Sequence, residues 1–162
     1  MLKKDLIRKK ILKIRRKKYF QVNSNFFNPL NSYLKKKYKS KSLFLSLYYP
    51  SNYEVDVLRL LEIVNNKKIK TLLPVVKPKE KMNFIEWKLL DPLRVNNFGM
   101  LEPNLNGRFL IPDIMLVPLI AFDTTKNRLG YGKGFYDRFL NRFLKQKKNI
   151  TTIGIAFSFQ RY

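Results

Sequence analysis

The spacing of apolar residues along the chain predicts four helices. Over residues 3–18, apolar side chains recur at helical intervals among basic ones, which predicts a cationic helix with one narrow apolar stripe. Asn28-Pro29 fits a cap followed by proline at the first helical position, so a second helix is expected to reach about Lys39. The same intervals predict helices over 54–66 and 135–144. The apolar stripe of the first helix consists of Leu6, Ile7, Ile11 and Ile14.

Short apolar runs bounded by turn residues predict strands between these helices. The run 114–122 is the most continuous, and we expect it to form a central strand covered on both faces. The proline-punctuated segment 91–112 is expected to be a loop. Strands that alternate with helices predict the α/β class, with a three-layer, mostly parallel, Rossmann-like sheet and helices on both faces. The other predicted strands are 42–49, 71–76, 82–87 and 151–159.

Length and composition indicate a single domain with a strong positive charge. With 162 residues the chain fits one domain, and 34 Lys and Arg against 11 Asp and Glu give a net charge of +23. Such a charge favours an anionic partner, which can be nucleic acid, a membrane surface or a phosphorylated small molecule. However, the basic residues are spread along the whole chain without a nucleic-acid-binding motif, and an AT-rich codon bias explains the Lys excess equally well. Nucleic-acid binding is therefore kept only as an alternative.

The chain contains no Cys and no His, which limits its chemistry. Disulfides, thiolate nucleophiles, a Ser-His-Asp triad and Cys-ligated zinc are excluded. A metal would be a hard cation bound by oxygen, and catalysis would depend on carboxylates, Lys, Arg, backbone amides and the substrate itself. No apolar signal-peptide core follows the basic start, and the longest uncharged stretch, 19–34, is too polar to span a bilayer. We therefore expect a cytoplasmic protein.

Residues 122–138 carry the strongest local motif. Three glycines stand at every second position, so that backbone amides can turn toward a ligand, and two basic side chains and a helix N-terminus lie beside them. This combination fits a polyphosphate, although neither the Walker A nor the Rossmann spacing is present, and a purely structural turn stays open. Asp137, in the first turn of the helix, fits a Mg²⁺ ligand or a simple partner of the helix dipole, and its spacing favours neither. The glycines are Gly130, Gly132 and Gly134, and the basic residues are Arg128 and Lys133.

The stretch 115–140 (MLVPLIAFDTTKNRLGYGKGFYDRFL) closely resembles the signature of the 5-formyltetrahydrofolate cyclo-ligase family, whose members are also called methenyltetrahydrofolate synthetases. In that signature a strand ending in V-P-G-x-A-F-D leads to N-R-L-G-x-G-x-G-Y-Y-D-R. The chain departs from it at Leu119, where Gly is usual, and at Phe135, which replaces the first Tyr. Other segments resemble family elements in the same order along the chain. They are 4–8 (KDLIR), 54–56 (EVD), 82–87 (M-x-F…W) and 99–103 (GMLEP).

The resemblance implies a role for each matching residue. ATP would contact Lys4, Asp5, Leu6, Ile7 and Arg8 of the first helix, and Arg128, Leu129, Gly130, Tyr131, Gly132, Lys133, Gly134, Phe135 and Tyr136 of the loop. The folate would contact Tyr49, Glu54, Trp87, Tyr131, Gly132, Lys133, Gly134 and Phe135. Lys133 and Arg128 would act catalytically on phosphoryl charge, and Asp137 would bind Mg²⁺. Other interpretations stay open, namely solvated charges for Lys4 and Arg8, a helix-start acid for Glu54 and a core residue for Trp87.

The resemblance also implies a reaction. The formyl oxygen on N5 of 5-formyltetrahydrofolate would attack the γ-phosphate of ATP, and N10 would trap the resulting iminium phosphate. The products would be 5,10-methenyltetrahydrofolate, ADP and phosphate. Because the attacking oxygen belongs to the substrate, the protein needs no nucleophile and has only to align two ligands and neutralise phosphoryl charge.

We therefore expect a monomeric, ATP- and Mg²⁺-dependent ligase of one-carbon folate metabolism that acts on 5-formyltetrahydrofolate, with or without a polyglutamate tail, and has no membrane partner. Residues 1–162 are expected to form one cyclo-ligase-like domain from which the C-terminal segment usual in the family is missing. One alternative is an inactive relative that still binds ATP or folate. The other is the basic nucleic-acid-binding protein.

Overall fold

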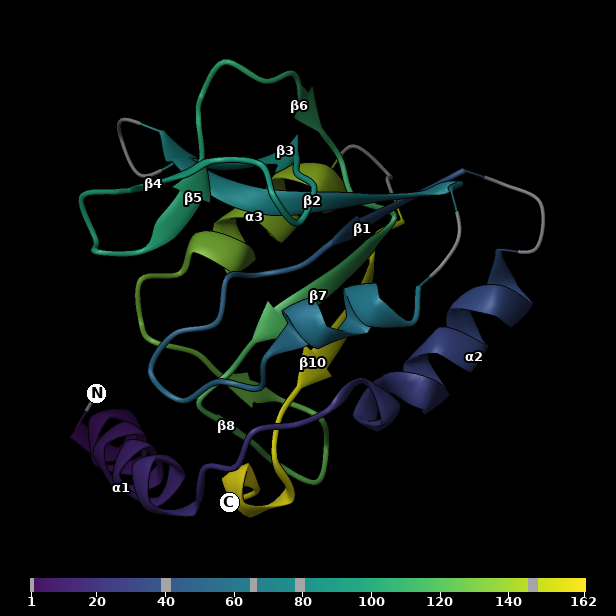
Figure 1. The fold of residues 1–162 in the computed structure, drawn as a ribbon. Coiled ribbons are helices and arrows are strands. Elements are labelled where there is room, and N and C mark those ends of the chain that lie inside the picture. Colours follow the sequence, from purple (N-terminus) through teal and green to yellow (C-terminus); the bar gives the residue numbers. More distant parts are fainter. Residues whose placement is uncertain (1, 39–41, 65–66, 78–80, 146–148) are drawn as a thin grey trace.

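The fold is built around one six-stranded sheet with the strand order β10-β7-β1-β2-β3-β6 (Figure 1). Neighbouring strands from β10 to β2 run parallel, whereas β3 and β6 pair antiparallel at the other edge. The predicted α/β class with a mostly parallel sheet is confirmed. The strands are β1 (Leu43–Ser46), β2 (Ile69–Lys77), β3 (Lys81–Glu86), β6 (Phe109–Leu110), β7 (Ile114–Pro118) and β10 (Thr151–Ile155). The residues described by this computed structural model are 2–38, 42–64, 67–77, 81–145 and 149–162.

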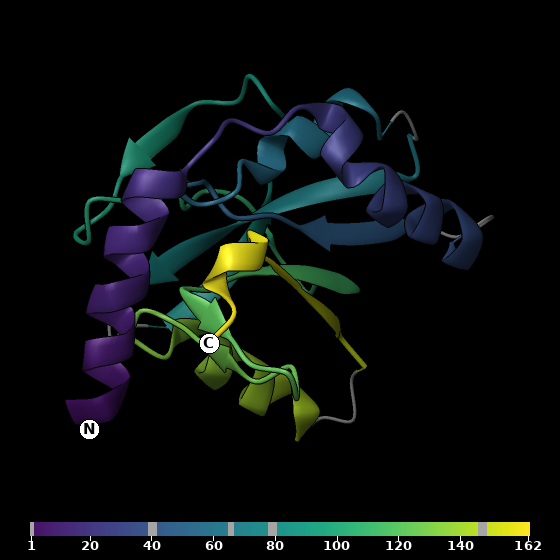
Figure 2. The same ribbon diagram turned by 90° about the horizontal axis from the view of Figure 1, so that it is seen from below.

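Helices cover both faces of the sheet. α2 (Asn28–Lys37) lies on one face with the 3₁₀ helices Ser24–Phe27 and Val57–Glu62, and α3 (Phe135–Leu144) lies on the other (Figure 2). None of the described helices is long and apolar enough to cross a membrane. Because successive strand residues point to opposite faces, β7 contributes to both cores. Its Ile114 and Leu116 join the core that contains Phe27, Leu34 and Leu60, and its Met115 and Val117 join the core that contains Leu72, Phe84 and Phe139.

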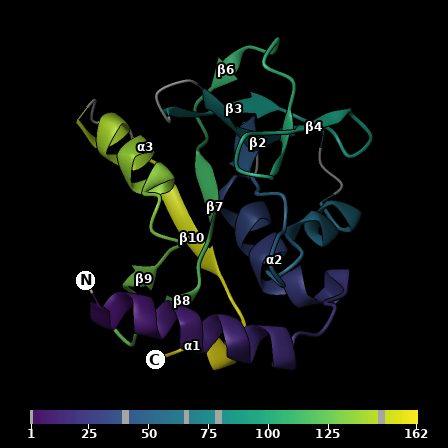
Figure 3. The same cartoon turned by 90° about the vertical axis from the view of Figure 1, so that its left-hand side faces the viewer.

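α1 (Leu2–Lys18) runs along a small hairpin beyond the end of β7 (Figure 3). This hairpin consists of β8 (Ala121–Phe122) and β9 (Arg128–Leu129), which pair antiparallel. Ile11 of α1 is buried against Ala121 and Leu129 of the hairpin. Since the glycine loop begins directly after β9, this packing places the N-terminal helix beside that loop.

Three predicted elements differ in kind from those in the structure. The described part of segment 54–66, which ends at Val64, contains only the 3₁₀ helix Val57–Glu62, whose first turn is fixed by a hydrogen bond from the Leu58 N–H to the Asp56 side chain. Segment 114–122 is two strands, because Pro118 has no N–H with which to continue the ladder and β8 starts only at Ala121. Segment 91–112 was expected to be a loop, but it contains β6 and the hairpin of β4 (Leu93–Val95) and β5 (Leu101–Pro103).

Other elements differ in length. The strands predicted at 42–49 and 151–159 shorten to β1 and β10, and β10 is followed by the 3₁₀ helix Ser158–Gln160. The second helix is capped by Phe27 rather than Asn28, which is itself helical. The strands predicted at 71–76 and 82–87 are confirmed as β2 and β3, and the helix at 135–144 is confirmed as α3. Positions 39, 65 and 66 of the predicted helices lie outside the described residues.

Candidate active site

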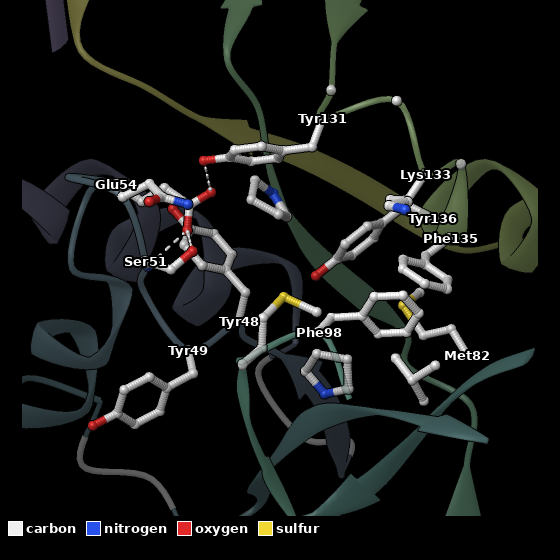
Figure 4. Close-up of a pocket in the computed structure, with 18 of the residues that line it drawn as sticks. Tyr48, Tyr49, Ser51, Glu54, Met82, Phe98, Tyr131, Lys133, Phe135 and Tyr136 are labelled. Atoms are coloured by element: carbon white, nitrogen blue, oxygen red, sulfur yellow. Dashed lines mark hydrogen bonds between the residues drawn. The ribbon is translucent and has the colours of Figure 1, made fainter. Parts of the chain in front are cut away.

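A cavity of about 720 Å³ lies where α1, the glycine loop, the β4–β5 hairpin and the segment after β1 meet (Figure 4). All of the motif residues 128–137 line it, together with Lys4, Arg8, Tyr49 and Glu54. Residues predicted to bind ATP and residues predicted to bind folate therefore share one cavity. The remaining lining residues are Tyr48, Ser51, Asn52, Pro74, Val76, Met82, Asn96, Phe98, Gly99, Met100, Leu101, Glu102 and Pro118.

Backbone geometry requires glycine at two positions of the loop. Gly132, with a φ of 93°, and Gly134, with a φ of 65°, lie in the left-handed region that side chains disfavour. Gly134 is also the N-cap of α3, and no side chain among the described residues caps the helix there. The first N–H groups of α3 therefore stay available beside the cavity, where the positive end of the helix favours a phosphate.

Cationic side chains surround this loop. The Arg8 guanidinium donates from Nε to the Gly130 carbonyl oxygen at 2.9 Å, and from Nη1 to the Asp5 carboxylate at 2.5 Å. The Lys133 ammonium lies 5.6 Å from the centre of the ring of Phe98, which is near the tip of the β4–β5 hairpin and also lines the cavity. Hydrogen bonds from cationic side chains to phosphate are stronger than neutral ones, and the N-terminus of a helix also favours an anion. The loop is thus suited to hold a polyphosphate.

Asp137 is the candidate Mg²⁺ ligand at this site. Its carboxylate is ion-paired with Arg128, and its side chain is 68% exposed. The described residues contain no group of three Asp or Glu that would enclose a metal ion. Mg²⁺ is commonly held by one or two carboxylates together with the phosphates of a substrate. The donor set fits that mode and does not fit a metal site made by the protein alone.

Glu54 provides a buried carboxylate on the opposite side of the cavity. It is only 6% exposed, and its Oε1 accepts a hydrogen bond of 2.8 Å from the Tyr131 hydroxyl. Its Oε2 accepts one of 2.9 Å from the Ser51 N–H. Burial raises the pKa of Glu54, while the hydrogen bonds from Ser51 and Tyr131 and the charge of Arg15 act in the opposite direction. The carboxylate is fixed in position and offers its remaining lone pairs to a ligand.

Tyrosine hydroxyls add neutral polar groups to the cavity. Desolvation raises the pKa of Tyr48, Tyr131 and Tyr136, so all three phenols stay protonated at neutral pH. Figure 4 shows the Tyr136 hydroxyl pointing into the cavity. A ligand in the cavity thus meets hydroxyl groups between the carboxylate and the cations.

The β4–β5 hairpin is part of the site that the sequence motifs did not assign. Phe98, near its tip, packs edge-on against Phe135 with ring centres 5.3 Å apart, which closes the cavity from that side. Glu102 fixes the hairpin from its buried position, with 1% exposure. Segment 99–103, which contains Glu102, resembles an element of the family, but that resemblance implies no role for it. Glu102 accepts hydrogen bonds from the Val76 N–H (2.8 Å), Arg94 Nη2 (2.6 Å) and Asn96 Nδ2 (2.9 Å).

Arg15 was also missed, because the packed face of the first helix was predicted from apolar residues alone. Ile7, Ile11 and Ile14 of the predicted stripe do pack with the β8–β9 hairpin. Leu6, which was predicted to be part of the stripe, is 63% exposed, whereas Arg15 is 1% exposed. Arg15 shares a face of α1 with Lys4, Arg8 and Ile11, which recur at helical intervals and reach the cavity, the loop or the hairpin. A helical wheel that included basic residues would have revealed this face.

Four predicted binding residues do not line the cavity. Trp87 is 2% exposed in the core, where its Nε1 donates to the Asp91 carbonyl at 3.1 Å, and this position agrees with the core role left open for it. Ile7 packs toward the β8–β9 hairpin, and Leu6 faces away. Asp5 contributes by pairing with Arg8 rather than by lining the cavity.

Comparison with known proteins agrees with the sequence resemblance. The model of the 5-formyltetrahydrofolate cyclo-ligase family matches residues 1–162. The chain is 34% identical over 123 residues to the 5-formyltetrahydrofolate cyclo-ligase of Haemophilus influenzae, a match that covers 72% of this chain and 65% of that protein. It is also 34% identical over 117 residues to the Mycoplasma genitalium protein of the same name, with 72% and 60% covered. The chain thus spans less than two thirds of the length of these curated relatives.

Solved structures give the same result. The chain is similar to the 5,10-methenyltetrahydrofolate synthetase of Aquifex aeolicus, with a TM-score of 0.68, 32% identity, and 99% of this chain and 80% of that chain covered. It is also similar to the 5,10-methenyltetrahydrofolate synthetase of Mycoplasma pneumoniae, with a TM-score of 0.72, 27% identity, and 98% and 88% covered. The likeness therefore extends over nearly all of this chain.

Proposed function

The chain belongs to the 5-formyltetrahydrofolate cyclo-ligase family, and on this basis we propose that it converts 5-formyltetrahydrofolate to 5,10-methenyltetrahydrofolate with ATP and Mg²⁺. The observation that carries the proposal is the shared cavity. Its glycine loop offers cations and backbone amides for a polyphosphate, and Glu54 lies across the same space, bonded to the loop residue Tyr131. Two ligands bound at these two places would meet at the loop.

On the phosphate side, the loop amides and the cations Arg8, Arg128 and Lys133 bind the polyphosphate. When bound, ATP supplies the phosphoryl group that activates the formyl oxygen, and Mg²⁺ offsets phosphate charge. Lys133 stands between two glycines, where its ammonium group can donate to the developing charge. Arg128, which is paired with Asp137, would hold the carboxylate that binds Mg²⁺ beside the loop, and it keeps guanidinium N–H groups for phosphate oxygens.

On the folate side, the Glu54 carboxylate accepts hydrogen bonds from N–H groups of the pterin ring. Its fixed geometry orients the ring so that the formyl group on N5 faces the glycine loop. Phe98 and Phe135 cover the cavity and keep water from the phosphoryl group. The protein thus aligns two ligands, which accounts for the absence of a protein nucleophile in the proposed reaction.

Calorimetric titrations test this division of the cavity. The parent protein is titrated with 5-formyltetrahydrofolate and with a non-hydrolysable ATP analogue, and each titration is repeated with Glu54→Gln and Lys133→Ala. We expect Glu54→Gln to weaken folate binding about tenfold or more and ATP-analogue binding less than about threefold, and Lys133→Ala to do the reverse. Glu62→Gln is the matched control, because Glu62 is exposed, does not line the cavity and forms a surface ion pair with Arg59. Failure of the parent to bind either ligand, or equal losses in both variants, would contradict the proposal.

A further inference from the structure

Arg15 is a buried cation whose position the proposed reaction does not yet explain. Among the described residues, it is the only Lys or Arg in the buried set, with 1% exposure. Its Nη2 donates a hydrogen bond to the Tyr131 hydroxyl, and its guanidinium carbon lies 5.7 Å from the centre of the Tyr131 ring. Burying a charge is costly unless it is paired, so the groups that contact Arg15 determine what this cation can do.

Arg15, Tyr131 and Glu54 form a series of two hydrogen bonds, in which each residue donates to the next. A guanidinium group has only donors, so the Tyr131 oxygen must accept from Arg15. The Tyr131 hydroxyl then has one proton to donate, and it lies 2.8 Å from Glu54 Oε1, which accepts it. The other oxygen of Glu54 is held by Ser51. Arg15 therefore determines which way the Tyr131 proton points, and through it the orientation of the carboxylate.

We propose that Arg15 is a positioning residue for the folate substrate, which acts through Tyr131 to hold the Glu54 carboxylate oriented toward the cavity. This inference rests on the proposed function for the identity of the ligand, but not for the effect on Glu54. Arg15 does not line the cavity, so it acts on the ligand only through Tyr131 and Glu54. The family resemblance of the first helix ends at Arg8 and assigns nothing to Arg15.

The charges around Glu54 give the expected direction of the effect. Burial raises the pKa of Glu54, and the positive charge of Arg15 and the Tyr131 hydrogen bond lower it. The other titratable groups that face it, Tyr48 and Tyr136, are neutral phenols and supply no counter-charge. Loss of Arg15 therefore raises the pKa of Glu54 further. Folate binding that needs the carboxylate strengthens as the pH rises through this pKa, so loss of Arg15 shifts that rise to higher pH.

A purely structural role for Arg15 must be separated from this one. Arg15 Nη1 also donates to the Leu119 carbonyl at 3.3 Å, where Gln160 Nε2 donates at 3.0 Å, so Arg15 also supports the break between β7 and β8. The test therefore compares Arg15→Met, which removes the charge, with Arg15→Lys, which keeps it. Arg16→Met is the matched control, because Arg16 is the next residue of the same helix and is exposed.

The first measurement is calorimetric binding of 5-formyltetrahydrofolate and of the ATP analogue across pH. We expect Arg15→Met to weaken folate binding about 10- to 100-fold, to move its pH dependence upward, and to change ATP-analogue binding less than about threefold. Arg15→Lys should recover much of the loss, and Arg16→Met should match the parent. In a Tyr131→Phe background, Arg15→Met should cost much less than it does alone, since the connection to Glu54 is already broken. Equal losses for both ligands, or no rescue by Lys, would overturn the proposal.

The second measurement does not depend on folate. The pKa of Glu54 is followed by carbon NMR of protein labelled at the side-chain carboxyl carbon of its five glutamates, and the Glu54 resonance is assigned by its absence in Glu54→Gln. We expect a higher pKa in Arg15→Met and Tyr131→Phe, and the parent value in Arg16→Met. If Arg15→Met does not fold, Tyr131→Phe and Arg15→Lys still decide the question. If the parent does not bind folate, the proposed function is wrong. If the pKa of Glu54 in Arg15→Met and Tyr131→Phe equals that of the parent, the proposed role of Arg15 is wrong.

Discussion

Arg8 and Gly130 are joined by a hydrogen bond of 2.9 Å between the guanidinium Nε and the carbonyl oxygen, across 122 residues of sequence. This bond ties α1 to the first glycine of the loop. A Cβ atom on Gly132 would lie 3.5 Å from the same guanidinium, so Arg8 also packs closely beneath the middle of the loop. Arg8 therefore supports the backbone that faces the polyphosphate, in addition to bringing a positive charge to it.

Replacement of Arg8 should reduce the affinity for ATP. Arg8→Met keeps much of the side-chain volume but removes the charge and the bond to Gly130. We expect the ATP analogue to bind about 10-fold or more weakly by calorimetry, because hydrogen bonds to charged groups are among the stronger ones. Lys9→Met is the control, since Lys9 is exposed on the same helix. Unchanged affinity in Arg8→Met would show that the phosphates lie elsewhere.

Lys133→Ala should lower turnover far more than stability. The Lys133 side chain is exposed, so its removal should change the free energy of unfolding by no more than about 0.5 kcal/mol. Loss of one preorganised donor to a developing charge typically lowers the rate about 10²- to 10³-fold. Steady-state kinetics and thermal unfolding measure the two effects. Lys13→Ala, at an exposed position of α1, serves as the control. A normal rate for Lys133→Ala would remove Lys133 from the site.

Asp137→Asn should change the response to Mg²⁺. The substitution keeps the shape of the side chain and removes the charge that a hard cation requires. At saturating ATP, the Mg²⁺ concentration for half-maximal rate should rise about 10-fold or more. Because Asp137 is 68% exposed, its ion pair with Arg128 should contribute little to stability. If the Mg²⁺ titration of the variant overlays that of the parent, Asp137 is a helix-start residue only.

Two alanine substitutions in the loop should differ in their effect on stability. Gly132 has a φ of 93°, which a residue with a Cβ atom adopts at a cost of about 1–2 kcal/mol. Gly130 is not among the residues with positive φ, and a Cβ atom there would meet only Arg128 Nη1, at 3.6 Å. Denaturant unfolding should therefore show a clear loss for Gly132→Ala and little change for Gly130→Ala. Equal losses would mean that the loop has another backbone conformation.

Sequence patterns predicted the parts of the fold that local interactions determine. The helix 135–144 was placed correctly because its periodicity is regular and a glycine precedes it. The β4–β5 hairpin was missed because Glu102 holds it through a bond to the Val76 N–H, 26 residues earlier. The strand at 114–122 was extended too far, because the apolar run was given more weight than Pro118, the residue at which the strand breaks. The pattern of neighbouring residues carries no information about a long-range contact such as that between Glu102 and Val76.

The difference between local and long-range contacts also explains which residues of the site could be predicted from the sequence. The glycine loop was recognised from adjacent residues, and its lining of the cavity follows from them. Arg15 was overlooked because the packed face of the first helix was predicted from apolar residues alone, and its link to Tyr131, 116 residues away, leaves no local signal. Trp87 was assigned to the folate by resemblance, whereas its indole is buried in the core and bonded to Asp91. The unusual Leu119 also has a distant explanation, because a Cβ atom on Gly154 would lie only 2.7 Å from its Cδ2, so Gly154 leaves the space that this side chain fills.

The most direct test of the central claim is the absorbance of 5,10-methenyltetrahydrofolate as it forms from 5-formyltetrahydrofolate. The purified chain is assayed with both ATP and Mg²⁺, with each omitted in turn, and with Lys133→Ala at equal concentration. The cavity described here predicts a product absorbance that grows only when ATP and Mg²⁺ are both present and that is nearly lost in Lys133→Ala. Binding of both ligands without any product, or product formation that does not need ATP, would contradict it.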